Sequence, residues 1–309
     1  MKSYYQVRLG KGGSFAEQCL REGFIGADFQ LGQDLTGKLP DQWRAFNKEF
    51  VPVWLKLHPD KSKIGAGLAC GALWTVARGI LKGDRVLSPD GDGGYLVGEV
   101  SGDYYYKPDD ILPHRRPVQW FGKRIAKSDI SAELKSATSY LGTVSNISTF
   151  IEEIERLTDG APPPRAVPAD AAIQDLAAFA MEKHLEDFLV QNWAQTELGR
   201  DFDIYEEEGE RKGQQYPTDT GPLDVLAISK DKTRLLVVEL KKGRASDSVV
   251  GQVMRYMGFV KEELAEPGQT VHGVIIAEDD DDQRIRRALS VVQNITFYRY
   301  QVSFKLVKA

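Results

Sequence analysis

The chain has 309 residues, of which 42% are hydrophobic and 28% are charged, and its formal net charge is −5 at pH 7. This length predicts about two domains, and the composition excludes a wholly disordered chain. No apolar run approaches the roughly 18 residues that a membrane helix needs, and residues 1–13 lack the apolar centre of a signal peptide. Cys19 and Cys70 form neither a disulfide framework nor a CxxC metal motif. We therefore expect a reduced, cytoplasmic protein without membrane contact.

The clearest boundary along the chain is the segment 158–171, which contains four prolines and shows no apolar periodicity. This composition is typical of a semi-rigid, extended linker. The sequence therefore predicts a first domain at residues 1–157 and a second domain at residues 172–309.

The first domain shows short strands among a few helices. The spacing of apolar residues and turn signals predicts helices at 15–22, 64–80, 128–141 and 148–157, and strands at 84–87, 95–100 and 118–121. Ser128 or Asp129 is the expected N-cap of the third helix. This pattern predicts a small, half-open α+β barrel.

The second domain has a clearer pattern. Helices are predicted at 173–192, 246–264 and 282–292, and strands at 202–206, 223–228, 235–240, 271–277, 295–300 and 302–307. Strands that alternate with helices in this order predict an α/β fold, with a mixed sheet flanked by helices.

Charged residues on two strands of the second domain form a candidate catalytic site. Asp224 interrupts an apolar strand, and Glu239 and Lys241 flank Leu240 at the end of the next strand. Side chains alternate along a strand, so Glu239 and Lys241 project from the same face. Two nearby carboxylates bind a hard cation such as Mg²⁺ or Mn²⁺ through oxygen. Such a cation activates water for attack on a phosphate, and a lysine can stabilise the developing charge.

A simpler explanation is that a strand ending in Glu-Leu-Lys-Lys only reaches solvent. Asp224 argues against it, because a buried carboxylate costs several kcal/mol unless it is paired or bound to a metal. Gln252 and Tyr256 add a second signal, since they are spaced i, i+4 on the following helix and share one face.

The residues at 215–218, 221–224, 238–245 and 252–257 resemble the NucS/EndoMS-type nuclease domain of the PD-(D/E)XK superfamily, which has a restriction-endonuclease-like fold. The shared pattern is D-x14-ExK followed by QxxxY, and the resemblance covers about residues 173–309. It implies a metal-dependent endonuclease that uses Mg²⁺ or Mn²⁺. It also implies these site residues: Asp224 and Glu239 as metal ligands, Lys241 as a catalytic residue, and Gln252 and Tyr256 as supporting residues.

The family also carries a glutamate on its first helix. Glu182 and Glu186 both qualify, because they lie one turn apart. The spacing of Glu182, three residues before Leu185, favours Glu182, and Glu186 remains the alternative.

The first domain is weakly similar to PUA-like barrels of the EVE and YTH kind at 81–87 and 98–104. This resemblance implies a pocket for a base, often a modified one. Aromatic side chains stack on flipped bases, so the pocket candidates are Trp43, Trp54 and Trp74, with burial in the core as the alternative for each. Candidate phosphate contacts are Arg115, Arg116, Lys242 and Arg244, and a solvated loop is the alternative for the arginine pair.

These observations predict a metal-dependent DNA endonuclease whose first domain reads modified bases, in a restriction-type defence role. We expect a homodimer, because one such site cuts one strand and a twofold axis supplies the second site. One alternative is a nucleic-acid-binding protein with an inactive, structural nuclease-like domain. Another is a nuclease directed at RNA, because PUA-like domains also bind RNA.

Overall fold

The computed structural model describes residues 2–139, 142–159, 185–207, 210–241, 245–278 and 283–300. The chain divides into two compact units, Met1–Ala166 and Val167–Ala309, and the division falls inside the segment 158–171. Most of that segment, most of the predicted helix 173–192 and the predicted strand 302–307 lie outside the described residues. No helix in the described ranges is long and apolar enough to cross a membrane.

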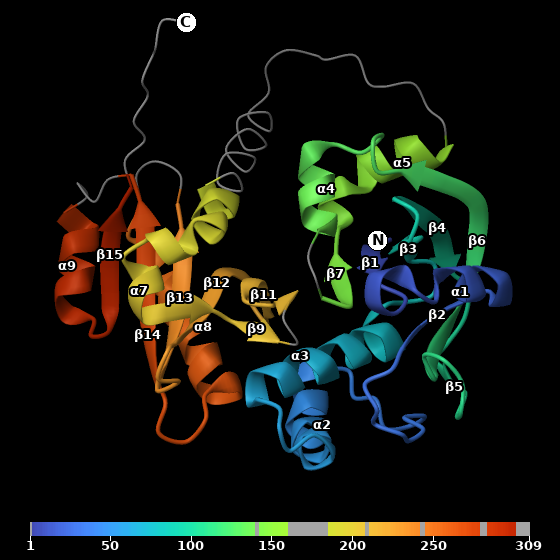
Figure 1. Ribbon diagram of the computed structural model, residues 1–309, viewed down its shortest axis with the longest axis horizontal. Coiled ribbons are helices and arrows are strands. Elements are labelled where there is room, and N and C mark those ends of the chain that lie inside the picture. The colour runs from blue at the N-terminus through green and yellow to red at the C-terminus, as the bar shows by residue number, and fades with distance from the viewer. Residues whose placement is uncertain are drawn as a thin grey trace, which may run out of the picture. The chain divides into compact units, whose positions relative to one another are not determined.

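The described strands of the first unit form a curled, seven-stranded sheet (Figure 1). The strand order is β2-β6-β4-β3-β1-β7, with β5 paired to β6; β1 and β3 are parallel, and the other pairs are antiparallel. The strands are β1 (Tyr4–Val7), β2 (Phe24–Ala27), β3 (Arg85–Pro89), β4 (Gly94–Val100), β5 (Tyr105–Tyr106), β6 (His114–Ala126) and β7 (Val144–Asn146).

The curl of this sheet centres on the long strand β6. Residues 114–117 pair with β2, and residues 118–126 pair with β4 across a register shift between Leu96 and Gly98. The backbones approach closely at Gly98, where an added Cβ would lie only 2.5 Å from Val118 Cγ1. A bulge at a glycine bends a strand strongly, which accounts for the curvature drawn in Figure 1.

Helices cover both faces of the sheet. Successive side chains of a strand point to opposite faces of the sheet. Val86 and Leu96 therefore belong to the core cluster on one face, and Leu87 and Val97 belong to the cluster on the other. The first cluster packs against α1 (Ala16–Glu22), α2 (Trp43–Leu57) and α3 (Lys63–Trp74), which continues as a π-helical segment, η2 (Thr75–Gly79). The second packs against α4 (Ala132–Thr138) and α5 (Ile151–Asp159), which follows a short 3-10 turn, η3 (Ser148–Phe150).

One local prediction for this unit was wrong, and one long helix was missed. The N-cap of α4 is Ser131, whose side chain accepts a hydrogen bond from Leu134 N at 3.0 Å, so neither Ser128 nor Asp129 has this role. The 15-residue helix α2 was not predicted at all. It contains Pro52, and a proline in a helical pattern normally marks an end or a kink.

The second unit is a mixed sheet with helices on both faces, as predicted (Figure 1). The strand order is β11-β12-β13-β14-β15, with β8 paired to β12. The pairs β11-β12 and β12-β13 are antiparallel, and β13-β14 and β14-β15 are parallel. The strands are β8 (Phe202–Ile204), β11 (Gln214–Thr218), β12 (Gly221–Ser229), β13 (Arg234–Leu240), β14 (Thr270–Ala277) and β15 (Ile295–Arg299), and β9 (Glu206–Glu207) and β10 (Glu210–Arg211) form a separate hairpin.

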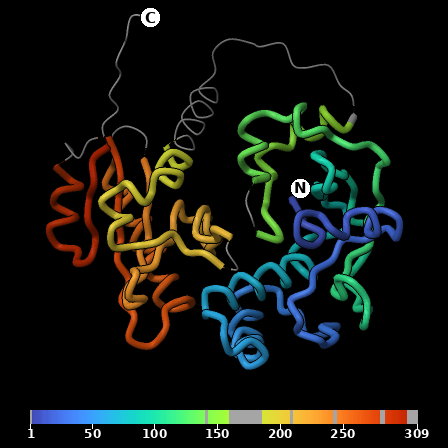
Figure 2. Tube along the Cα trace, viewed as in Figure 1, coloured from blue at the N-terminus to red at the C-terminus, as the bar shows by residue number. Residues whose placement is uncertain are grey.

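The helices of this unit pack on both faces of the sheet, and Figure 2 shows the path of the chain. Residues 185–191 are helical, and this segment and Trp193 pack on one face. On the other face α8 (Ser248–Phe259), continued by the π-helical segment η5 (Val260–Leu264), packs against β13 and β14. Gly273 permits this contact, because an added Cβ would lie 2.6 Å from Val253 Cγ1. The remaining described helices are η4 (Trp193–Gln195), α7 (Leu198–Asp201) and α9 (Gln283–Val291).

Candidate active site

Three polar residues form a row across neighbouring strands of the second sheet. The pairs Gln214–Val225 and Tyr216–Leu223 place Gln215 opposite Asp224. The last pair of β12 and β13 is Val225–Val238, so one further step places Glu239 opposite Asp224. Residues directly opposite each other in a sheet project from the same face. The strand register therefore places Asp224 and Glu239 on one face, and a hydrogen bond from Gln215 Nε2 brings Gln215 beside Asp224.

Asp224 is held by two hydrogen bonds, one on each carboxylate oxygen. Oδ2 accepts from the backbone nitrogen of Leu240 at 2.7 Å, and Oδ1 accepts from Gln215 Nε2 at 3.3 Å. The Leu240 nitrogen belongs to the peptide that joins Glu239 to Leu240, so the carboxylate lies beside the backbone of the second acid. Asp224 is half-buried, which corrects the expectation of a buried carboxylate at this position.

The deeply buried acid of the pair is Glu239, whose side chain is 3% exposed. Its Oε1 accepts a hydrogen bond from Lys241 Nζ at 2.8 Å, and the Lys241 side chain is 30% exposed. The two side chains therefore lie on the same face, as strand alternation predicts. Lys241 offsets the charge of Glu239 and brings an ammonium group to the solvent side of the site.

A third acid, Glu186, joins this network from the helical residues 185–191. Glu186 is 4% exposed, and its two oxygens accept hydrogen bonds from Gln214 Nε2, at 2.7 Å, and Gln215 Nε2. Because Gln215 Nε2 also donates to Asp224, Glu186 is connected to the row on the strands. Glu182, the other first-helix candidate, lies outside the described residues.

The two glutamines of β11 were not predicted as site residues. Gln215 belongs to the motif that carries the family resemblance, but its contact with the acids is seen only in the hydrogen bonds of its side chain to Glu186 and Asp224. These contacts depend on how β11 pairs with β12, which the sequence alone does not specify.

Helix α8 supports the site through Tyr256 and Gln252. Tyr256 Oη donates to the carbonyl oxygen of Pro222 at 3.0 Å, and Gln252 Nε2 donates to Tyr256 Oη at 3.4 Å. Burial raises the pKa of Tyr256 above its ordinary value of 10; the Gln252 hydrogen bond and the Lys241 charge oppose this shift, and the carboxylates of Glu239 and Asp224 add to it. The phenol is therefore neutral near pH 7, and it fixes the backbone two residues before Asp224.

Tyr256→Phe is expected to lower the free energy of unfolding by about 1 kcal/mol, because it removes one hydrogen bond and leaves the Pro222 carbonyl unpaired. We also expect the DNA cleavage that the sequence predicts to fall several-fold, since the start of β12 loses its attachment to α8. Chemical denaturation and a cleavage assay measure the two effects. Tyr298→Phe on β15 is the matched control, and equal losses in both variants would contradict a role for Tyr256 at the site.

The tryptophans proposed for a base pocket differ in burial. Trp54 is 7% exposed, its Nε1 donates to the Phe29 carbonyl at 2.8 Å, and it belongs to the core cluster. The prediction that Trp54 lines an open pocket is therefore corrected by its burial. Trp43 and Trp74 are half-buried, and Trp74 Nε1 donates to the Pro40 carbonyl at 2.8 Å. These two remain candidates.

The predicted phosphate contact of the first unit is also corrected. Arg115 and Arg116 are 1% and 4% exposed, and both donate to backbone carbonyls of their own unit. Their neighbour His114 carries no charge near pH 7, because burial lowers its pKa to about 4. These side chains stabilise the fold and offer no exposed charge to a phosphate. Lys242 and Arg244 lie outside the described residues.

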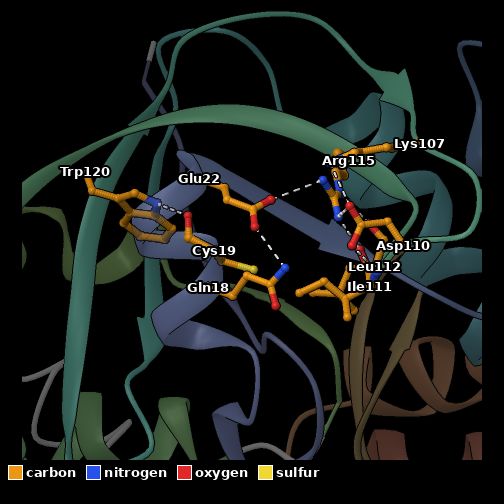
Figure 3. A network of polar contacts seen from close by, with 9 residues as sticks. All are labelled: Gln18, Cys19, Glu22, Lys107, Asp110, Ile111, Leu112, Arg115 and Trp120. Carbon is orange, nitrogen blue, oxygen red and sulfur yellow. Dashed lines mark hydrogen bonds and ion pairs between the residues drawn. The ribbon is translucent and has the colours of Figure 1, made fainter.

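Arg115 is the centre of a buried polar network (Figure 3). Its guanidinium lies 3.1 Å from Asp110 Oδ2 and 3.7 Å from Glu22 Oε2, and it donates to the carbonyls of Ile111 and Leu112. A hydrogen bond from Lys107 is the main cause that lowers the pKa of Asp110 to about 2, and the Arg115 charge contributes. Arg115 thus attaches the chain before β6 to the sheet.

The donor atoms of the second unit fit a hard divalent cation. No three His, Cys, Asp or Glu side chains within the described ranges are grouped to hold a metal ion. Mg²⁺ sites usually use one or two carboxylates and complete the shell with waters and substrate phosphates, and Asp224 and Glu239 are carboxylates on the neighbouring strands β12 and β13. Both acids therefore offer the oxygen donors that Mg²⁺ or Mn²⁺ prefers.

Comparison with known proteins gave two family matches. Residues 5–148 match a domain of unknown function, DUF8426, and residues 181–301 match the endonuclease NucS C-terminal domain. No curated protein matches the chain.

Several solved structures are similar to the chain. An EndoMS complex with double-stranded DNA has 14% identity and a TM-score of 0.30, and the match covers 68% of this chain and 62% of that one. A repair endonuclease from Pyrococcus abyssi has 16% identity and a TM-score of 0.30, with 68% and 75% covered. EndoMS in its apo form has 16% identity and a TM-score of 0.29, with 72% and 79% covered. The chain thus spans less than two thirds of the first of these structures. The family match at residues 181–301 identifies the second unit as a NucS-type endonuclease C-terminal domain.

Proposed function

We propose that the protein is a metal-dependent endonuclease that hydrolyses phosphodiester bonds in DNA. The observation that carries this proposal is the hydrogen-bonded connection from Glu186 through Gln215 to Asp224, and from Asp224 to the peptide of Glu239. It brings acids and Lys241 together in a NucS-type domain. A related structure is described as a complex of EndoMS with double-stranded DNA, and DNA is the substrate that we propose.

In the proposed mechanism, Asp224 and Glu239 would hold Mg²⁺ or Mn²⁺. When bound, such a cation polarises the scissile phosphate and lowers the pKa of an attacking water. Lys241 is placed to orient that water or to stabilise the charge that develops on the phosphate, because Glu239 holds its ammonium group at 2.8 Å. We propose Glu186 as the first-helix acid of the site because of its contacts with β11, while Glu182 lies outside the described residues. Tyr256 and Gln252 keep the start of β12 in position.

For the first unit we propose a role in choosing the substrate, as a PUA-like reader of modified bases in a restriction-type enzyme. Trp43 and Trp74 are half-buried, and Tyr105 is 37% exposed. Stacking of a base on such a side chain is worth about 1–3 kcal/mol. We further propose that the enzyme works as a homodimer in the cytoplasm, so that two sites cut the two strands.

The test of this function is cleavage of plasmid DNA in parallel reactions with Mg²⁺, Mn²⁺ or EDTA. We expect EDTA to abolish cleavage and excess Mg²⁺ or Mn²⁺ to restore it, because the carboxylates alone lack the Lewis acid that activates water. DNA with unmodified, methylated, hydroxymethylated or glucosylated bases tests the reader role, and an RNA substrate tests the RNA alternative. Cleavage that persists in EDTA would contradict the mechanism, and binding without cleavage would favour an inactive nuclease-like domain.

A further inference from the structure

We propose that Gln215 is a positioning residue that holds the carboxylates of Glu186 and Asp224 at a fixed separation. This inference rests on the proposed nuclease function and adds a residue to which no role in it has been given. Gln215 Nε2 donates to Glu186 Oε2 and to Asp224 Oδ1, so one side-chain amide connects an acid on a helix with an acid on a strand.

The chemistry of the two partners fixes the orientation of this amide. An ionised carboxylate accepts hydrogen bonds and cannot donate them, whereas a glutamine side chain has an NH₂ group with two donors and an oxygen that only accepts. The NH₂ group must therefore face the acids, with one donor for each. The opposite orientation would direct an oxygen at two negatively charged groups.

A second glutamine completes the support of Glu186. Gln214 Nε2 donates to Glu186 Oε1 at 2.7 Å and to Asp187 Oδ1 at 3.0 Å. Each oxygen of the buried Glu186 carboxylate is thus held by a different glutamine of β11. Of these two glutamines, Gln215 also donates to Asp224, so its side chain links the two acids directly.

The backbone conformation of Gln215 is a second, independent sign that this position is unusual. Its backbone dihedral φ is +52°, which lies in the left-handed region that residues other than glycine seldom adopt. Such conformations cost free energy and persist where the surrounding structure enforces them, often at functional sites. A glycine would adopt this φ with less strain, but it would provide no side-chain amide to donate hydrogen bonds to Glu186 and Asp224.

Without the side-chain amide of Gln215, the carboxylates of Glu186 and Asp224 would lose the hydrogen bonds that link them. We expect them to separate, which would misplace the oxygens of Asp224 relative to Glu239. Residues that orient metal-binding or catalytic groups through hydrogen bonds typically change metal affinity or activity by about 10–100-fold when mutated. We expect an effect of this size on the catalytic rate, and a much smaller effect on the affinity for DNA.

The test compares Gln215→Met and Gln215→Gly with the wild-type full-length protein. Methionine keeps the length of the side chain but has no donor, and glycine also relieves the strained φ. Lys232→Gly is the matched control, because Lys232 has a φ of +60° in the turn at the opposite end of the β12-β13 hairpin. The measurements are kcat and KM for plasmid cleavage, Mn²⁺ affinity by calorimetry in the absence of DNA, and Tm.

We expect both Gln215 variants to lose about 10–100-fold in kcat, with weaker Mn²⁺ binding and a KM for DNA within about twofold of wild type. Lys232→Gly should retain wild-type kcat and Mn²⁺ affinity. If Gln215→Met fails to fold, Gln215→Gly decides the question. Wild-type kcat and Mn²⁺ affinity in a folded Gln215 variant would overturn the inference and leave the proposed function intact. A wild-type protein that neither binds Mn²⁺ nor cleaves DNA would overturn both.

Discussion

We expect Glu239→Gln to reduce DNA cleavage by on the order of 10³-fold, because metal catalysis is worth several kcal/mol and each 1.4 kcal/mol is tenfold in rate. Glutamine keeps the volume of glutamate and keeps an oxygen for Lys241 Nζ, which donates to Oε1 in the wild-type protein. The substitution therefore removes a negative charge from the proposed metal site with little other change. The measurement is the single-turnover rate of plasmid cleavage at saturating Mg²⁺.

Glu266→Gln is the matched control, because it makes the same chemical change at an exposed position before β14. It should cleave DNA at the wild-type rate. Circular dichroism and the Tm should show that both variants are folded. Wild-type cleavage by a folded Glu239→Gln variant would show that the chemistry takes place elsewhere.

Asp224→Asn should also abolish cleavage, but it is the less specific change. Both oxygens of Asp224 accept hydrogen bonds, from Gln215 Nε2 and from Leu240 N. Asparagine has only one side-chain oxygen, so its NH₂ group must face one of these donors. We expect this mismatch to lower the free energy of unfolding by about 1–3 kcal/mol, a loss that Glu239→Gln avoids.

The grouping of Asp224, Glu239 and Lys241 was predictable because it depends on local rules. Alternation along one strand places Glu239 and Lys241 together, and a neighbouring antiparallel strand supplies Asp224. The choice between Glu182 and Glu186 was not predictable in the same way, because the two residues are one helical turn apart in the sequence. Glu186 contacts the glutamines of β11, and Glu182 lies outside the described residues.

The overall α/β organisation of the second unit was predictable for a similar reason, since its strands are apolar runs separated by clear turn signals. The first unit was harder. Helix α2, which contains Pro52, was not predicted. Arg115 and Arg116 were predicted to contact phosphates, with a solvated loop as the alternative, but both are buried. One partner of Arg115, Glu22, is remote from it in sequence and adjacent only in the folded chain.

The buried side chain of Arg115 contacts two carboxylates, two backbone carbonyls and an aromatic ring. Its guanidinium is near Asp110 and Glu22, donates to two backbone carbonyls, and lies 3.8 Å from the centre of the Phe24 ring (Figure 3). Arginine presents a planar group with five donors, which allows several partners and an aromatic face to be used together. Lysine has a compact ammonium group and cannot reproduce this arrangement.

We therefore expect Arg115→Ala to lower the free energy of unfolding of the first unit by about 2–5 kcal/mol, because it removes a buried side chain that packs on Phe24 and leaves the carbonyls of Ile111 and Leu112 without its hydrogen bonds. Arg124→Ala is the control on the same strand. Arg124 contacts Glu17 and Asp90, but its side chain is 42% exposed, and exposed ion pairs contribute about 0–1 kcal/mol. Guanidinium denaturation followed by tryptophan fluorescence suits the test, since Trp193 alone of the five tryptophans lies in the second unit. A loss below about 1 kcal/mol for Arg115→Ala would contradict a structural role, and Arg115 would again be a candidate for DNA contact.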